Sequence, residues 1–258
     1  MFQGKSILAV IPARLESARL PRKLLLDQTG KPVIQHTWEA AKSISTLDDV
    51  VIATDSEEIA SVARQFGGTA IITGAHRTGT DRIAEAVTSS DFDSTRFDLI
   101  VNIQGDEPEI TSEPVNAVIC GLIDDPDAGL STAVTRFHSL DELHDPGCVK
   151  VVGTTSGRAL YFSRSVIPCL KYHRETIDDL DTLPVRRHIG LYGFRRSFLQ
   201  QWPNLPQSSL ERIESLEQLR PLQAGIPIHI TEVSSHPPGI DLLHDYEAFV
   251  ERAAITRD

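Results

Sequence analysis

The chain has 258 residues, enough to bury one large core, and carries 36 Asp and Glu against 25 Lys and Arg, a net charge of −11. This acidic balance argues against wholesale nucleic-acid binding and against adhesion to anionic membranes. The first apolar run is far too short for a membrane helix, so we expect no membrane insertion. Cys120, Cys148 and Cys169 lack metal-ligand spacing. They predict reduced, mostly buried thiols in a cytoplasmic protein.

Strand-length apolar runs alternate with helical patterns through the first half of the chain. Strands are expected over residues 6–11, 50–54, 69–73 and 98–104. Helices are expected over 33–44, from the acidic turn at 55–58 to Gly67, and over 80–88 and 114–123. This order predicts one α/β domain over residues 1–258, with a mostly parallel sheet covered by helices on both faces.

The middle of the chain changes character. Strand-like runs at 130–136, 149–152, 159–163 and 189–194 have few helices between them, which predicts a smaller β-rich subdomain over residues 130–195. The alternation resumes with a helix over 209–224, a strand over 226–233 and a last helix over 244–254.

The segment IPARLESARLPRK, residues 11–23, follows the first apolar strand and carries Arg14, Arg19, Arg22 and Lys23. Four cations this close need an anion, and phosphate suits paired guanidinium donors and a lysine point charge. The alternative is a solvated loop whose arginines serve solubility. The chain has neither GxxxxGK[ST] nor GxGxxG, so side chains and loop amides would hold the phosphate.

An acidic turn, Gln104-Gly105-Asp106-Glu107-Pro108, follows the fourth expected strand, and Asp241 follows the last one. Ligands of open parallel sheets bind at the carboxyl ends of the strands, so we expect the basic loop and the acidic turn to converge. Carboxylates there suit Mg²⁺, which completes its shell with water and phosphate oxygens. Plain surface turns are the alternative at both positions.

Three further patterns are ambiguous. Thr80 in TGTDR is either a helix N-cap or part of a ligand-binding turn. Ser208 and Glu211 form a capping box, and the predicted helix after them places Glu214, Glu217 and Gln218 on one face, either solvated or lining a pocket. Arg164 ends an apolar strand, and His188 lies beside another, where a core histidine is the usual interpretation.

Taken together, these segments resemble the 3-deoxy-manno-octulosonate cytidylyltransferases, or CMP-Kdo synthetases. The matching blocks run in order from about residue 7 to 241: IPARLESARLPRK, VVIATD, TGTDRIAE, VNIQGDEP, VKVV, ALYFSRSVIP, RRHIGLYGF, LERIESLEQLRPL and GID. The first block alone would suit several sugar nucleotidyltransferases. Its combination with YFSR, RHIGLYG and LE.LEQLR is much more specific.

The resemblance implies transfer of CMP from CTP to Kdo for lipopolysaccharide synthesis, a GT-A-like Rossmann core, Mg²⁺ as cofactor, and a homodimer formed through the β-rich segment. It also implies roles for individual residues. Those implied for CTP are Arg14, Arg19, Lys23, Thr78 and Arg82. Those implied for the sugar are Gln104, Arg164, His188, Tyr192, Glu214, Glu217 and Gln218. The metal ligands would be Asp106 and Asp241, which with Lys23 form the implied catalytic set.

The sequence departs from the family pattern at three places. Arg22 replaces a glycine, Asp145-Pro146-Gly147 replaces NPN, and the usual TPEDL after Asp241 is absent, so we expect the supporting turn of that carboxylate to be lost. These departures leave an amino-substituted Kdo or another 2-keto-3-deoxy acid open as the sugar. A glycosyltransferase would need an Asp-x-Asp motif, which the acidic turn lacks. A catalytically silent CTP-binding regulator is the non-enzymatic alternative.

Overall fold

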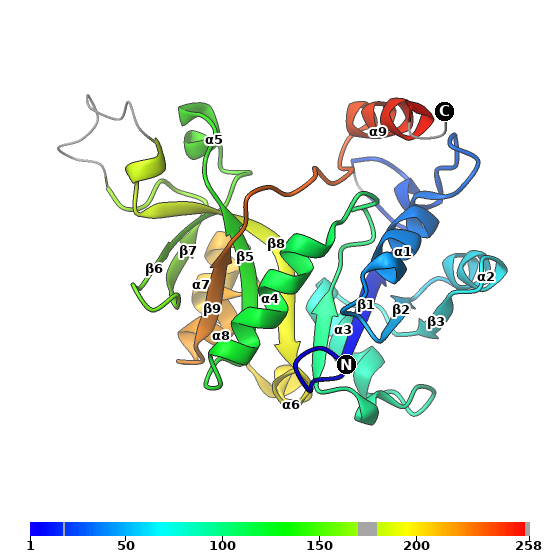
Figure 1. Cartoon of the computed structure of the whole chain (residues 1–258), viewed down its shortest axis with the longest axis horizontal. Coiled ribbons are helices and arrows are strands. Elements are labelled where there is room, and N and C mark those ends of the chain that lie inside the picture. Colours follow the sequence, from blue (N-terminus) through cyan, green and yellow to red (C-terminus); the bar gives the residue numbers. More distant parts are fainter. Residues whose placement is uncertain (18, 170–179, 256–258) are drawn as a thin grey trace. The chain divides into compact units, whose positions relative to one another are not determined.

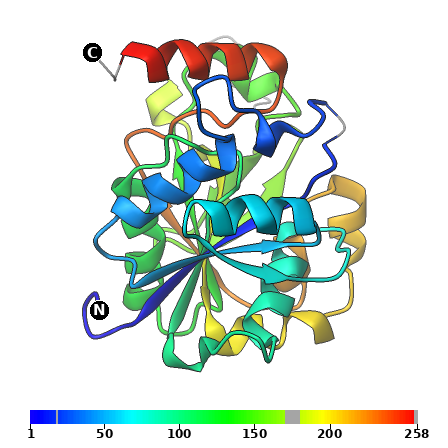
Figure 2. The same cartoon turned by 90° about the vertical axis from the view of Figure 1, so that its right-hand side faces the viewer.

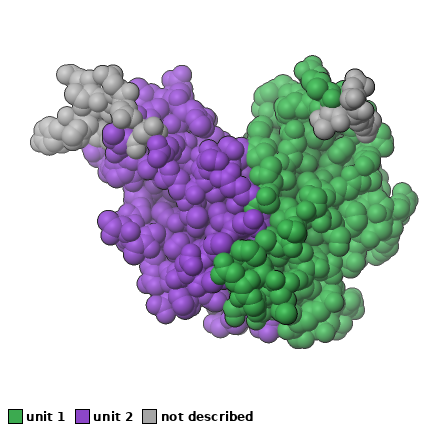
Figure 3. All heavy atoms as spheres, viewed as in Figure 1, with its two compact units in different colours: residues 1–112, 237–258 green, residues 113–236 purple. Residues whose placement is uncertain are grey.

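The computed structural model describes residues 1–17, 19–169 and 180–255. The chain divides into two compact units: unit 1 comprises Met1–Ser112 and Pro237–Asp258, and unit 2 comprises Glu113–His236 (Figure 3). Unit 1 is therefore discontinuous in sequence. Residues 170–179 of the expected 130–195 subdomain lie outside the described part.

Unit 1 contains four parallel strands in the order β3-β2-β1-β4 (Figure 1). These are β1 (Ile7–Ala13), β2 (Asp49–Thr54), β3 (Thr69–Ile72) and β4 (Leu99–Asn102). Val10 of β1 pairs with Val51 on one side and Asn102 on the other. β1, β2 and β4 are buried along almost their whole length, as expected for continuous apolar runs in a parallel sheet.

The helices of unit 1 are α1 (Val33–Ser43), α2 (Glu57–Gln65), α3 (Gly79–Thr88) and α9 (Leu243–Ile255), with short 3₁₀ turns at Lys23–Leu25 and Ser94–Arg96. Figure 2 looks onto this unit with α1 and α2 in front of its strands. The Ser56 side chain caps α2, confirming the start read from the sequence. α3 is capped by Thr78 and not by Thr80, which is buried inside the first turn, so the N-cap alternative for Thr80 was wrong.

Unit 2 is built on β5 (Leu130–Thr135), which pairs in parallel with β9 (Ile228–Glu232) and antiparallel with β8 (Val185–Arg195). A hairpin of β6 (Lys150–Gly153) and β7 (Ala159–Ser163) continues the sheet beyond β8. The long helix is α4 (Ser112–Asp124). Short elements complete the unit: α5 (Leu140–His144), α6 (Arg196–Leu199), α7 (Ser209–Glu214), α8 (Leu219–Gln223), and 3₁₀ turns at Leu180–Thr182 and Trp202–Asn204.

The single helix expected over 209–224 is wrong, because the chain breaks it into α7 and α8. Ser215 adopts a left-handed conformation (φ 54°, ψ 47°), and its amide and that of Leu216 both donate to the Glu211 carbonyl. Pro221 explains the break: in a continuous helix its ring would clash with the carbonyl four residues earlier. Glu214, Glu217 and Gln218 therefore do not share a helix face.

Smaller differences concern lengths and burial. The strand expected over 98–104 ends at Asn102, and β8 begins four residues earlier than expected. The cysteines are free thiols, but Cys169 is exposed and the other two are only half-buried, so the expected burial was wrong. Among the residues described, no helix is both long enough and apolar enough to cross a membrane.

Candidate functional site

The basic loop leaves the end of β1 and closes into the 3₁₀ turn at Lys23. Arg14 and Arg19 are exposed, whereas the Lys23 side chain is only 14% exposed. Arg22 has a left-handed backbone (φ 55°, ψ 27°), and its guanidinium contacts Glu58. Glycine adopts a positive φ at least cost, so a large side chain at this position carries some backbone strain.

The acidic turn follows β4 and lies against the end of β1. A β-carbon on Gly105 would lie 3.2 Å from the Pro12 carbonyl oxygen and 3.3 Å from Leu24 Cδ1, so the close approach of the turn to β1 favours glycine. The buried Thr37 hydroxyl donates to the Gly105 carbonyl at 2.9 Å. These contacts fix the backbone that carries Asp106.

Lys23 joins the two segments. Its ammonium contacts the Asp106 carboxylate and donates to the Ile240 carbonyl at 2.9 Å and to Asp241 Oδ1 at 3.4 Å. Arg19 Nη2 donates to the same Asp241 oxygen at 2.9 Å. The predicted convergence of the basic loop and the acidic turn is therefore confirmed, and Asp241 belongs to the same cluster.

The segment around Asp241 is anchored on both sides. The Ile240 amide donates to the Asp106 carbonyl at 2.8 Å. The amides of Asp241 and Leu242 donate to Asp245 Oδ2 at 3.0 and 2.7 Å. Although burial raises the pKa of Asp245, these donors and nearby cations bring it below its ordinary value. The expected loss of a supporting turn was wrong, because Asp245 at the start of α9 rebuilds one.

Thr78 caps the N-terminus of α3, and Arg82 lies in the first turns of that helix. Arg82 is buried, and its guanidinium donates to Asp55 at 2.8 Å, to the Thr73 hydroxyl at 2.6 Å and to the Gly74 carbonyl at 3.3 Å. These bonds connect the carboxyl ends of β2 and β3. Arg82 thus holds the turn that carries Thr78, and its donors face protein acceptors.

Arg164, at the end of β7, binds three backbone carbonyls. Its guanidinium donates to those of Glu214 at 2.8 Å, Pro146 at 2.9 Å and Ser215 at 3.4 Å. The Glu214 carboxylate in turn accepts from the Ser163 hydroxyl at 2.7 Å and from the Arg164 amide at 2.9 Å. The structure brings these two predicted residues together around the left-handed Ser215.

Lys150 of β6 was not predicted as part of any site. It is fully buried, and its ammonium donates to the carbonyls of Asp145 at 2.6 Å and Arg164 at 3.0 Å. Burial lowers its pKa below the ordinary value. Lys150 therefore ties the 145–147 turn to the end of β7. The sequence did contain a signal for this buried lysine, because Lys150 lies among three valines in an expected strand.

His188 and Tyr192 of β8 lie in an aromatic row. The His188 ring is 5.1 Å from the Phe162 ring and 5.5 Å from that of Tyr192, and its Nε2 lies 2.9 Å from the Thr132 hydroxyl. Burial lowers the pKa of His188 to about 3, so the imidazole is neutral near pH 7. Burial, reinforced by the charge of Glu217, raises the pKa of Tyr192 well above its ordinary value.

Glu217 and Gln218 lie in the turn between α7 and α8. Gln218 is 2% exposed, and its Nε2 has no hydrogen-bond partner among the described residues. A buried amide donor without an acceptor costs free energy unless a ligand or water supplies one. This orphaned donor is the strongest local sign that the turn faces a polar ligand.

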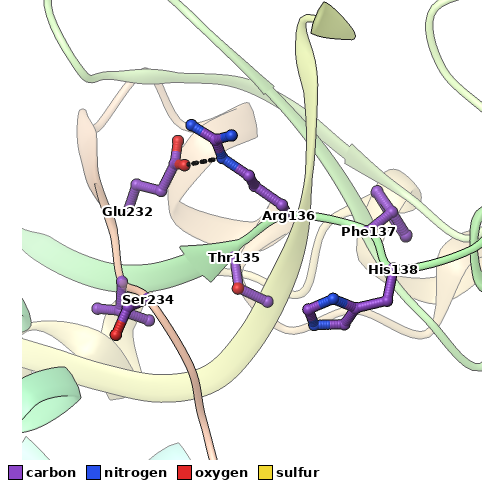
Figure 4. Close-up of a pocket in the computed structure, with 7 residues that line it drawn as sticks. Thr135, Arg136, Phe137, His138, Glu232 and Ser234 are labelled. Atoms are coloured by element: carbon purple, nitrogen blue, oxygen red, sulfur yellow. Dashed lines mark hydrogen bonds and ion pairs between the residues drawn. The ribbon is translucent and has the colours of Figure 1, made fainter. Parts of the chain in front are cut away.

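A cavity of about 630 Å³ opens in unit 2 where β5 and β9 end (Figure 4). Arg136 Nε donates to Glu232 at 2.8 Å, and Arg186 Nε donates to the other oxygen of that carboxylate at 2.7 Å. The Glu232 carboxylate on this wall is thus held by two guanidiniums, one of which, Arg136, also lines the cavity. The lining was not predicted from the sequence and includes Thr135, Arg136, Phe137, His138, Glu232 and Ser234.

The residues at the Lys23 cluster fit a divalent cation by their chemistry. Asp106 and Asp241 offer hard carboxylate oxygens around one point. Among residues 1–17, 19–169 and 180–255, no group of three or more His, Cys, Asp or Glu side chains gathers as a metal site. A cation here would therefore need further oxygens from water or phosphate, as Mg²⁺ ordinarily does.

Comparison with known proteins agrees with this geometry. The family model described as cytidylyltransferase matches residues 8–230. The 3-deoxy-manno-octulosonate cytidylyltransferase of Rhodopirellula baltica is 41% identical, over 94% of this chain and 96% of that protein. The enzyme of the same name from Cellvibrio japonicus is 43% identical, over 91% and 92%.

Solved structures give the same result. The CMP:2-keto-3-deoxy-manno-octonic acid synthetase complexed with CTP superposes with a TM-score of 0.86 at 38% identity, covering 97% of this chain and 99% of that one. A cytidylyltransferase from Leptospira borgpetersenii, 16% identical over 97% of this chain and 87% of its own, shares the fold with a TM-score of 0.60. By sequence and by fold, the chain belongs to the 3-deoxy-manno-octulosonate cytidylyltransferase family.

Proposed function

We propose that the chain transfers CMP from CTP to the anomeric hydroxyl of Kdo, releasing pyrophosphate and giving CMP-Kdo for lipopolysaccharide synthesis. The observation that carries this proposal is the Lys23 cluster: cations of the basic loop meet Asp106 and Asp241 in the region of the β1 and β4 carboxyl ends. A triphosphate needs the cations, and its metal needs the carboxylates.

The residues of unit 1 take distinct roles in this proposal. Arg14, Arg19 and Lys23 bind the CTP phosphates, Thr78 lies near the cytosine, and Arg82 positions the Thr78 turn through the bonds described above. Gln104 contacts the sugar from the acidic turn. Phosphoryl transfer of this kind depends on positioning and charge neutralisation, so no side-chain nucleophile is required.

Asp106 and Asp241 would hold Mg²⁺. When bound, the ion neutralises phosphate charge and lowers the pKa of the attacking hydroxyl. The chain itself orients the carboxylates, through Gly105 on one side and Asp245 on the other. Arg19 and Lys23 then neutralise the departing pyrophosphate, which carries charge away from the α-phosphorus.

The sugar acid is bound by Arg164, His188, Tyr192, Glu214, Glu217 and Gln218. A neutral His188 and a protonated Tyr192 present hydrogen-bonding groups to hydroxyls, and the orphaned Gln218 Nε2 supplies a donor. Arg164 acts by holding the Pro146, Glu214 and Ser215 carbonyls in place. We also propose a homodimer formed through the β-rich segment, and a cytoplasmic location.

The test is pyrophosphate release from CTP and Mg²⁺ with Kdo, 8-amino-Kdo, sialic acid or no sugar. Release with Kdo alone supports the proposal. Release only with the amino sugar keeps the chemistry and changes the substrate to a related 2-keto-3-deoxy acid. Silence with every sugar, together with measurable CTP binding, would identify a regulator instead of an enzyme.

Asp106→Ala is expected to abolish turnover while leaving the fold intact, because the carboxylate lies at a turn and not in the core. Circular dichroism and steady-state rates at saturating Mg²⁺ check both parts. Asp91→Ala, at an exposed position of the same unit, is the matched control. Retention by Asp106→Ala of more than about a tenth of the wild-type rate would refute the metal-binding role.

A further inference from the structure

The Lys23 ammonium occupies the position that the proposed function gives to a metal ion. It reaches Asp106 and Asp241 together, and the Ile240 carbonyl completes its acceptors. The lysine is largely buried, whereas the guanidinium of Arg19, which shares Asp241, belongs to a side chain that is 64% exposed. Without nucleotide, each predicted metal ligand already has a cation.

The charge and the position of the Lys23 ammonium determine whether the carboxylate pair can bind a metal ion. Two carboxylates against one ammonium and one guanidinium leave the cluster neutral. The ammonium uses one oxygen of each carboxylate, Asp106 Oδ2 and Asp241 Oδ1. A divalent cation bound to both carboxylates at about 2.0–2.6 Å would therefore lie close to the ammonium, and their repulsion in a partly buried site is poorly screened. Metal binding is therefore opposed as long as Lys23 stays between the carboxylates.

A bound triphosphate would draw the Lys23 ammonium away from the two carboxylates. Arg19 and Lys23 are the cations that the proposed function assigns to phosphate, and phosphate oxygens compete with the carboxylates for them. Once the ammonium turns to phosphate, Asp106 loses its internal cation and Asp241 keeps only the exposed Arg19, so both carboxylates become available as metal ligands. A change that favours one ligand of the pair favours the other by the same factor, because coupling between binding sites is reciprocal.

We propose that Lys23 is an internal counter-ion that keeps the Asp106–Asp241 pair closed to divalent metal until a nucleoside triphosphate draws its ammonium away. This inference rests on the proposed function for the identity of the ligands. It adds an order: the carboxylate pair binds metal weakly in the nucleotide-free protein and strongly once a triphosphate is bound. A purely structural ion pair would impose no such order.

The test measures Mn²⁺ binding to nucleotide-free protein, by the electron paramagnetic resonance signal of free Mn²⁺. Lys23→Met removes the charge and keeps the length, and Lys23→Gln also keeps a donor for the Ile240 carbonyl. Both are expected to bind Mn²⁺ about tenfold more tightly than wild type, or better. Lys23→Arg keeps the charge and should stay at the wild-type level.

Two controls locate the effect. Lys31→Met removes a half-exposed ion pair with Glu39 in the same unit and should not change Mn²⁺ affinity. Adding Asp106→Asn to Lys23→Met should abolish the gain. The proposal is overturned if Lys23→Met and Lys23→Gln, folded by circular dichroism and melting temperature, bind Mn²⁺ within about twofold of wild type.

The melting temperatures are recorded first, and Lys23→Gln serves if Lys23→Met fails to fold. The outcome is separable from that of the proposed function. Pyrophosphate release by wild type with unchanged Mn²⁺ affinity in both variants would reject only the counter-ion role. A gain in Mn²⁺ affinity in a protein that releases no pyrophosphate would keep that role and reject the enzymatic proposal.

Discussion

Glu211→Ala is expected to be among the most destabilising single substitutions in unit 2. Glu211 and Arg220 form a bidentate pair at 2.9 and 2.6 Å, and their side chains are only 4% and 9% exposed. Arg220 also lies 4.7 Å from the Trp202 ring. Glu211 completes a capping box with Ser208 at the start of α7. The pair holds α7 and α8 together across the break at Ser215.

The magnitude follows from two losses. Removing one partner of a buried pair leaves the other charge without compensation, which typically costs about 3–5 kcal/mol. The substitution also removes the acceptor of the Ser208 amide, but the Ser208 hydroxyl still accepts from the residue 211 amide, so this second loss is at most about 1 kcal/mol. The total of about 3–6 kcal/mol compares with about 5–15 kcal/mol for the whole stability of a typical protein. A large fraction of the molecules would unfold at moderate denaturant.

Urea unfolding followed by circular dichroism measures this cost. The matched control is Glu57→Ala, which removes a carboxylate from the first turn of α2. The Glu57 side chain is 72% exposed, and its partner Arg64 also faces solvent. Glu57→Ala should lower the free energy of unfolding by at most about 1 kcal/mol. If Glu211→Ala costs no more than Glu57→Ala, the reasoning from burial is wrong.

The remaining predictions concern the sugar site and the basic loop. Arg164→Ala should raise the KM for the sugar acid at least about tenfold and that for CTP less than about twofold; steady-state kinetics showing equal changes would count against the assignment. Burial lowers the pKa of His188 to about 3, so between pH 6.5 and 3 the unfolded chain binds a proton that the folded chain excludes. The free energy of unfolding therefore falls as the pH drops from about 6.5 towards 3, by up to about 1.4 kcal/mol per pH unit. His188→Gln should flatten that part of the urea-derived stability profile, with the exposed His244→Gln as control; identical profiles for His188→Gln and wild type would contradict the burial argument. Arg22 has a left-handed backbone, so the free energy of unfolding of Arg22→Gly should stay within about 1 kcal/mol of wild type. Arg22→Val should be about 1–2 kcal/mol less stable than Arg22→Gly. Equal stabilities of the two variants would rule out backbone strain at this position.

The regular elements of unit 1 could be predicted because their signals are local. Continuous apolar runs gave the buried strands, and Ser56 and Gly67 marked the two ends of α2. Convergence of the basic loop with Asp106 followed from the general position of ligands at strand ends. The break between α7 and α8 also had a signal, Pro221, but the apolar periodicity around it favoured a continuous helix.

The roles of individual side chains were harder to predict. Arg82 and Arg164 are the kind of cationic side chain that binds anionic ligands. In the structure their guanidiniums donate instead to protein oxygens, whose positions depend on distant loops. The support that Asp245 gives to Asp241 was not predicted, because the residues after Asp241 differ from the usual family pattern while an aspartate still accepts from the backbone amides of the turn. The Arg82 and Arg164 contacts depend on tertiary structure, which local patterns do not encode, whereas the Asp245 contacts span only three and four residues.

The discontinuity of unit 1 sets an order for synthesis of the protein. Asp106 and Lys23 leave the ribosome early, but Asp241 and its support Asp245 follow only after the whole of unit 2. Residues 113–236 can fold as an uninterrupted segment, while the first part of unit 1 waits for α9. A nascent chain stopped before residue 237 therefore carries the basic loop with only one of the two carboxylates, Asp106 and Asp241, that Lys23 contacts.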